Sequence, residues 1–142
     1  MALIGLDIDG VLRKLPLPIR YAMKYSSPTD IFEKARLGFI KRRVLQGLIL
    51  YTPFILNGPL IERFKTQEVV IISSRKEDCE ELSSLFQRYL KVKSFYCRGN
   101  QSIYEKDFKL KYCRQANIQV FYEDRKYIVK FLRENGINVV EV

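Results

Sequence analysis

The chain has 142 residues and a mass of 16.8 kDa, which is the size of one domain and enough to form a core without disulfide bonds. Apolar residues make up 47% of it and charged residues 29%, a composition that excludes disordered and collagen-like chains. The sequence has no histidine, which excludes Ser-His-Asp and Cys-His catalysis and histidine-bound zinc. We therefore predict a single domain over 1–142, in which carboxylates or lysines carry out any acid or base chemistry.

The net charge is strongly positive. Lysine and arginine number 25 against 16 aspartates and glutamates, which gives +9. Such an excess favours anionic partners, among them nucleic acids and phosphorylated substrates. The alternative interpretation is a basic surface that only maintains solubility.

Three features of the sequence bear on the cellular location of the protein, namely its cysteines, its N-terminus and one apolar stretch. Cys79, Cys97 and Cys113 are odd in number and lack CxxC spacing, so we expect reduced thiols rather than a disulfide framework or a zinc site. The N-terminus does not resemble a signal peptide, which predicts a cytoplasmic protein. The apolar stretch 44–61 contains Pro53 and Pro59, so we expect a helical hairpin that is buried or contacts a partner, with a homodimer as one option, rather than a membrane span.

Apolar runs alternate with amphipathic segments along the chain. The runs predict buried strands, and the segments between them predict helices, one of which carries Ser102 and Glu105 as a capping box. The predicted strands cover 2–6, 69–72, 92–97, 118–122 and 137–142, and the helices between them cover 82–90, 102–115 and 128–132. This alternation predicts an α/β fold, a three-layer Rossmann-like parallel sheet of about five strands.

A mostly helical insert is expected after the first strand, over 13–65. Pro16 and Pro18, with Pro28 just beyond, favour a loop or flap over 13–27. Ser27 then has the character of an N-cap, and Pro28 suits the first position of a helix that runs to about Leu45.

Polar side chains follow three of the predicted strands. Asp7 follows the first strand, Ser73 the second, and Glu123-Asp124 the fourth. Because ligands of parallel α/β sheets bind at the carboxyl ends of the strands, these side chains should share one rim. Carboxylates gathered there repel each other unless a cation is bound, and ligand sets of oxygen alone suit Mg²⁺. The chemistry indicated is phosphoryl transfer, with an ionised aspartate as nucleophile and a second carboxylate as acid and base.

These residues resemble the four motifs of the haloacid dehalogenase (HAD) superfamily. Residues 7–12, DIDGVL, are similar to the DxDG(T/V)L signature, and 69–75, VVIISSR, to the second motif. Residues 107–111, DFKLK, resemble the third motif, and 121–125, FYEDR, the acidic fourth motif. The resemblance covers essentially the whole chain and implies a HAD-like fold.

The resemblance also implies a role for each motif residue. Asp7 would be the nucleophile and a metal ligand, and Asp9 would be the general acid and base, with its backbone carbonyl on the metal. The phosphoryl group would contact Ser73, Ser74, Arg75 and a lysine of the third motif. Lys109 fits that motif best, although Lys106 and Lys111 lie near it. Glu123 and Asp124 would hold Mg²⁺.

A finer resemblance concerns the C-terminal part. Residues 122–142, beginning YEDR, are similar to the end of polynucleotide kinase/phosphatase-type 3′-phosphatase domains, and Arg75 also fits that subgroup. The Walker motif of a kinase is absent from the sequence.

The leading hypothesis is a Mg²⁺-dependent phosphomonoesterase that forms an aspartyl-phosphate, at nucleic-acid 3′ ends among the candidate substrates. The alternatives are a phosphatase of small metabolites and a catalytically idle HAD-like module that binds nucleic acid.

Overall fold

A five-stranded parallel sheet forms the centre of the computed structural model, which describes residues 3–25 and 54–142. In spatial order its strands are β5 (Lys91–Cys97), β4 (Glu68–Ser73), β1 (Ile4–Leu6), β6 (Val120–Glu123) and β7 (Val139–Glu141). Each predicted strand matches one of these within three residues at either end. The predicted α/β fold with a parallel sheet is therefore confirmed.

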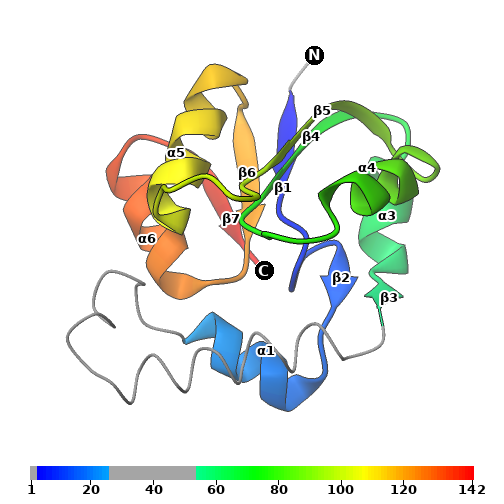
Figure 1. The fold of residues 1–142 in the computed structure, drawn as a ribbon, viewed down its shortest axis with the longest axis horizontal. Helices are drawn as coiled ribbons and strands as arrows, with labels where there is room; N and C mark the ends of the chain where they lie inside the picture. Colours follow the sequence, from blue (N-terminus) through cyan, green and yellow to red (C-terminus); the bar gives the residue numbers. More distant parts are fainter. Residues whose placement is uncertain (1–2, 26–53) are drawn as a thin grey trace.

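Helices cover both faces of the sheet. On one side lie α3 (Gly58–Phe64) and α4 (Cys79–Gln87), and on the other α5 (Glu105–Gln115) and α6 (Lys126–Glu134) (Figure 1). Alternation along β4 shows why both faces need cover, since Val69 and Ile71 pack in one core cluster while Val70 and Ile72 pack in the other. Both clusters consist of buried apolar residues, so the central strands are buried on two sides.

The described part of the insert lies at the carboxyl edge of the sheet. A small antiparallel pair joins β2 (Arg13–Lys14) to β3 (Ile55–Leu56), and α1 (Leu17–Lys24) crosses below that edge (Figure 1). Lys24 connects α1 to the end of β7, because its Nζ donates to the carbonyl of Val142 at 3.3 Å.

The loop predicted over 13–27 is wrong for residues 17–24, which are helical. Pro18 is compatible with this helix because it stands in the first turn, where a proline needs no N–H donor. The predicted helix from Ser27 to Leu45 and most of the apolar stretch 44–61 lie outside the described residues. Within residues 3–25 and 54–142, nothing supports the homodimer that was one option for that stretch. Over 3–25 and 54–142, no helix is both long and apolar enough to cross a membrane.

A disulfide bond joins Cys79, the first residue of α4, to Cys97, the last residue of β5, with a Cα–Cα distance of 6.0 Å. The prediction of three reduced thiols is therefore wrong for these two, while Cys113 is free and buried. The odd count misled because it says nothing of which cysteines the fold brings together. β4 pairs with β5 along its length, so the loop after β4 lies beside the end of β5.

Candidate active site

Three carboxylates meet at the carboxyl ends of the two central strands β1 and β6. Asp7 follows β1, Glu123 ends β6, and Asp124 comes next. Each offers one oxygen, and these oxygens all lie within 4.8 Å of one another. The sheet pairing explains the meeting, because Leu6 stands opposite Tyr122 in the parallel register of β1 and β6. All three residues are buried.

A single ammonium group compensates much of this charge. Lys109 of α5 is fully buried, and its Nζ lies 2.6 Å from Glu123 Oε2, 3.2 Å from Asp7 Oδ2 and 3.3 Å from Glu105 Oε1. The structure thus places Lys109 at the carboxylates. Lys106 and Lys111 instead lie over aromatic rings, those of Phe131 and Tyr112.

Burial shifts the pKa values of this cluster, because its charged groups are removed from water. Burial raises the pKa of Asp7 well above its ordinary value, and Glu123 adds to the shift while Lys109 opposes it. Burial alone would lower the pKa of Lys109, but the carboxylates of Asp7, Glu123 and Glu105 raise it well above its ordinary value. Lys109 therefore stays charged and holds one oxygen of Asp7, while the other oxygen has no donor among the described residues.

Asp124 is the carboxylate that its surroundings leave unsatisfied. It is fully buried, and within residues 3–25 and 54–142 neither of its oxygens has a hydrogen-bond partner. Burial raises its pKa well above the ordinary value, and the neighbouring Glu123 adds to the shift. Burying a carboxylate without a partner costs free energy, so this side chain is suited to bind a cation.

Unlike Asp124, Glu123 has hydrogen-bond donors at both of its carboxylate oxygens. One oxygen accepts from Lys109, and the other accepts the backbone N–H groups of Asp124 and Arg125 at 3.1 and 3.2 Å. Its carboxylate therefore positions Lys109 and the start of α6. The group Asp7, Glu123 and Asp124 fits a hard divalent cation with oxygen ligands such as Mg²⁺. Among the described residues, one oxygen of Asp7 and both oxygens of Asp124 have no donor.

The carboxylate of Asp9 lies apart from that group. Its Oδ1 accepts from Arg13 Nη1 at 3.0 Å and from Arg75 Nη1 at 3.1 Å. Arg75 comes from the loop after β4, so this contact joins two of the predicted motifs across the rim. The resemblance implies that Asp9 holds the metal through its backbone carbonyl and uses its side chain as acid and base. In the structure, that side chain contacts two arginines.

The loop after β4 connects the rim to α5. Ser73 Oγ accepts the backbone N–H of Arg75 at 3.2 Å, while Ser74 Oγ donates to Glu105 Oε1 at 2.7 Å. Glu105 also forms an ion pair with Arg125. Although burial would raise the pKa of Glu105, Arg125 and Lys109 hold it well below its ordinary value. Glu105 is therefore a charged link between Ser74 and Lys109.

The sequence predicts a different role for Glu105, in a capping box with Ser102. The capping box with Ser102 is wrong, because the N-cap of α5 is Tyr104 and Glu105 is the first helical residue. The usable signal was the spacing of Glu105 and Lys109, four residues apart on a helix and hence on one face. Arg13 was also missed, since its short strand β2 gives no sequence signal for a contact with Asp9.

No family model and no curated protein matches the chain. Among solved structures, a chain of the Pnkp1/Rnl/Hen1 RNA repair complex is similar, with a TM-score of 0.59 and 15% identity over 100% of this chain. This chain spans 42% of that protein's length. A HAD-superfamily hydrolase of subfamily IA from Geobacter sulfurreducens PCA is similar with a TM-score of 0.56 and 13% identity, covering 99% of this chain and 89% of that one.

The chain has a HAD-like fold. In this HAD-like fold, the end of the central strand β1 carries Asp7 and the adjacent strand β6 carries the acidic pair Glu123-Asp124. The carboxylate cluster thus lies at the carboxyl ends of the strands, where ligands of parallel α/β sheets bind.

Proposed function

We propose that the protein is a Mg²⁺-dependent phosphatase that hydrolyses phosphomonoesters through an aspartyl-phosphate. The observation that carries this proposal is the buried Asp7 carboxylate, which Lys109 holds by one oxygen at 3.2 Å beside the unsatisfied Asp124. A nucleophile fixed in this way next to a cation site is suited to attack on phosphorus.

In the first step, an oxygen of Asp7 forms a bond to phosphorus as the bond from phosphorus to the ester oxygen breaks. Asp9 gives a proton to the leaving oxygen. In the second step, water attacks the aspartyl-phosphate, Asp9 takes back a proton, and Asp7 and inorganic phosphate are released. Lys109 keeps Asp7 oriented throughout and offsets negative charge between nucleophile and phosphate.

The phosphoryl group would contact the loop after β4, through Ser73, Ser74 and Arg75. In the structure Arg75 bonds Asp9, at 3.1 and 3.4 Å to its two oxygens. A phosphate dianion would compete for this guanidinium, because arginine binds phosphate and carboxylate with the same planar fork. Asp7, Asp124 and Glu123 would hold Mg²⁺, which supplies neutralisation of the charge on the transferring group.

The substrate proposed is the 3′-phosphorylated end of a nucleic acid. Two observations support it, namely the net charge of +9 and the similarity to a chain of an RNA repair complex. A cytoplasmic location remains a prediction from the sequence.

Phosphate release tests the proposal. The assay compares 3′- and 5′-phosphorylated oligonucleotides with nucleotides, sugar phosphates and p-nitrophenyl phosphate, each with Mg²⁺ and with EDTA. We expect release only with Mg²⁺, highest from the 3′-phosphorylated oligonucleotide, and a loss of at least about 10³-fold in Asp7→Asn. Glu134→Gln is the matched control, since it also removes one carboxylate but from the exposed end of α6, where Glu134 pairs only weakly with Lys130 at 4.0 Å.

Each other outcome identifies an alternative. Release mainly from small esters would indicate a metabolite phosphatase and make the charge a surface property. No release from any substrate, with salt-dependent binding of oligonucleotides, would indicate an idle binding module. Full activity in Asp7→Asn would remove Asp7 as the nucleophile.

A further inference from the structure

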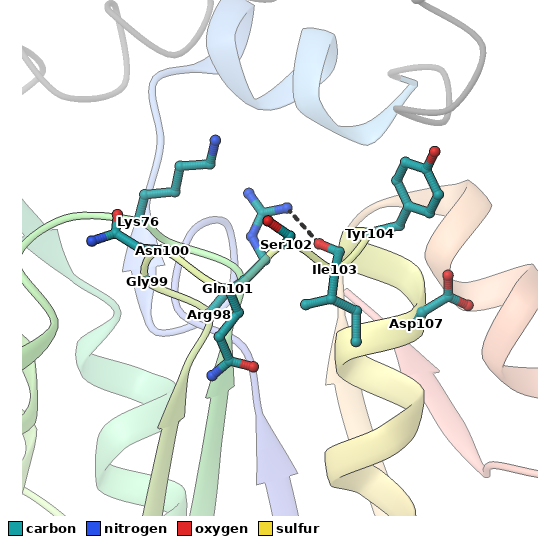
Figure 2. A pocket seen from close by; sticks show the side chains of 9 residues that line it. All are labelled: Lys76, Arg98, Gly99, Asn100, Gln101, Ser102, Ile103, Tyr104 and Asp107. Carbon is teal, nitrogen blue, oxygen red and sulfur yellow. Dashed lines mark hydrogen bonds between the residues drawn. The ribbon is translucent and has the colours of Figure 1, made fainter.

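A polar pocket of about 680 Å³ lies beside the loop after β4, between the end of β5 and the start of α5. Figure 2 shows Lys76 and Tyr104 on opposite sides of it, both pointing toward α1, with the guanidinium of Arg98 between them. This volume lies within the range of sites that bind small organic ligands, which is roughly 300–1,000 Å³. It would accommodate one nucleotide unit.

The pocket shares its wall with the candidate active site. The backbone N–H of Arg98 donates to the carbonyl of Ser73 at 3.0 Å, and its Nε donates to the carbonyl of Ser74 at 3.1 Å. Gly99 N–H donates to the carbonyl of Arg75 at 3.0 Å. A substrate whose terminal phosphate contacts Ser73, Ser74 and Arg75 would therefore extend its next unit toward this pocket.

The cations of the pocket favour a phosphate group. Arg98 is 8% exposed, and its Nη1 donates to the carbonyl of Ile103 at 3.3 Å, while Nη2 has no acceptor among the described residues. Within the same residues Lys76 forms no ion pair. The pocket also contains one carboxylate, that of Asp107, which leaves an excess of one positive charge. A buried guanidinium with a free donor is suited to a phosphate oxygen.

The remaining lining suits a nucleobase. Tyr104 is 43% exposed, so its ring offers a face on which a planar base can stack. The amides of Asn100 and Gln101 and the hydroxyl of Ser102 offer both donors and acceptors, as the edge of a base or a ribose requires. A sugar phosphate would use the cations but not the exposed ring.

We propose that this pocket binds the nucleotide adjacent to the phosphorylated end of a single-stranded nucleic acid, with its phosphate at Lys76 and Arg98 and its base on Tyr104. This inference rests on the proposed function, because the adjacent loop would hold the scissile phosphate. It adds a second contact site, which would set the preference for polynucleotides over small esters.

Direct binding tests the pocket without relying on turnover. The probe is a fluorescein-labelled hexanucleotide without a terminal phosphate, of RNA and of DNA, and the readout is fluorescence anisotropy over a range of salt concentrations. Tyr104→Ala should weaken binding roughly tenfold, and Lys76→Met should weaken it and lower the salt slope by about one. Tyr89→Ala is the matched control, since Tyr89 is an exposed tyrosine outside the pocket, and it should bind like the wild type.

Turnover separates this inference from the proposed function. If the protein is active, Tyr104→Ala should raise KM for the 3′-phosphorylated hexanucleotide roughly tenfold and more than for p-nitrophenyl phosphate. Equal binding by wild type, Tyr104→Ala and Lys76→Met would overturn the pocket assignment even if phosphatase activity is found. Weaker binding by both variants of a protein without activity would uphold the pocket and remove the phosphatase.

Discussion

The carboxylate of Asp124 occupies the space in which a side chain at Gly10 would stand. A Cβ atom at Gly10 would lie 1.9 Å from Asp124 Oδ2, and the backbone of Gly10 has a φ of +82°. The glycine after Asp9 thus serves two needs, a left-handed turn and close approach of a carboxylate. It brings the loop after β1 against the loop after β6, where the candidate cation site lies.

Gly10→Ala should therefore both destabilise the protein and displace Asp124. We expect a loss of about 2–4 kcal/mol in unfolding free energy, from strain at positive φ plus the steric conflict, together with loss of stabilisation by Mg²⁺. Chemical denaturation with and without Mg²⁺ measures both. Gly136→Ala is the control, because Gly136 has a φ of +85° but no atom within 4 Å of the added Cβ. Equal losses in the two variants would contradict the steric argument.

Asp124→Asn should separate charge from shape at the same place. Its buried carboxylate lies beside Glu123 and has no hydrogen-bond partner in the described part of the chain, so removing the charge relieves repulsion when no metal is bound. In EDTA we expect the melting temperature to rise by roughly 3–6 °C, equivalent to about 1–2 kcal/mol. With Mg²⁺ the wild type should gain stability and the variant should not. An equal Mg²⁺-induced shift in both proteins would place the cation elsewhere.

Lys109→Met should be among the most damaging single changes in the core. It leaves Asp7, Glu105 and Glu123 buried without their shared ammonium group. Removing one partner of a buried ion pair costs about 3–5 kcal/mol. Lys111→Met, on the exposed side of the same helix, should stay within about 0.5 kcal/mol of the wild type in urea unfolding.

Where Lys109→Met does not fold, the double variant Lys109→Met/Asp7→Asn provides the second measurement, because Glu105 also forms an ion pair with Arg125, whereas the side chain of Asp7 is held by Lys109. The double variant removes one of the three carboxylates along with the ammonium, so it should recover part of the lost stability. Equal stability of Lys109→Met and Lys111→Met would contradict the central position of Lys109.

The cysteines should differ in reactivity. Burial raises the pKa of the Cys113 thiol to about 12, so it should resist alkylation in the native protein even at pH 9. Without reductant, iodoacetamide followed by mass spectrometry should find no modified cysteine in the native protein. After reduction, Cys79 and Cys97 should be modified and Cys113 should not. Labelling of Cys79 before reduction would contradict the disulfide.

Loss of the disulfide should also lower stability. It closes a segment with a sequence separation of 18, for which the chain-entropy contribution is about 3 kcal/mol. Cys79→Ser/Cys97→Ser should therefore unfold at a lower urea concentration than the wild type, whereas Cys113→Ala reports on a buried thiol and not on a cross-link. A double variant as stable as the wild type would mean that the bond does not form in solution.

The sequence by itself determined the strands and the polar residues that follow them. Apolar β-branched runs such as 69–72 can bury both faces only in a covered sheet, and polar residues follow where burial stops. That local pattern was sufficient to predict five parallel strands and to select Asp7, Ser73 and Asp124, because it depends on neighbours in the chain. It also carried the resemblance to HAD proteins.

The sequence predicted that these groups share one rim, but only the tertiary structure decided which side chains contact each other there. The strand order puts β1 between β4 and β6, and this brings Asp7 to Glu123 while Asp9 turns toward Arg75. The same packing selected Lys109 among three lysines, paired Cys79 with Cys97 and made room at Gly10 for Asp124. These choices depend on distances between residues far apart in the chain, and such distances are set by the packing of whole elements, which no local spacing encodes.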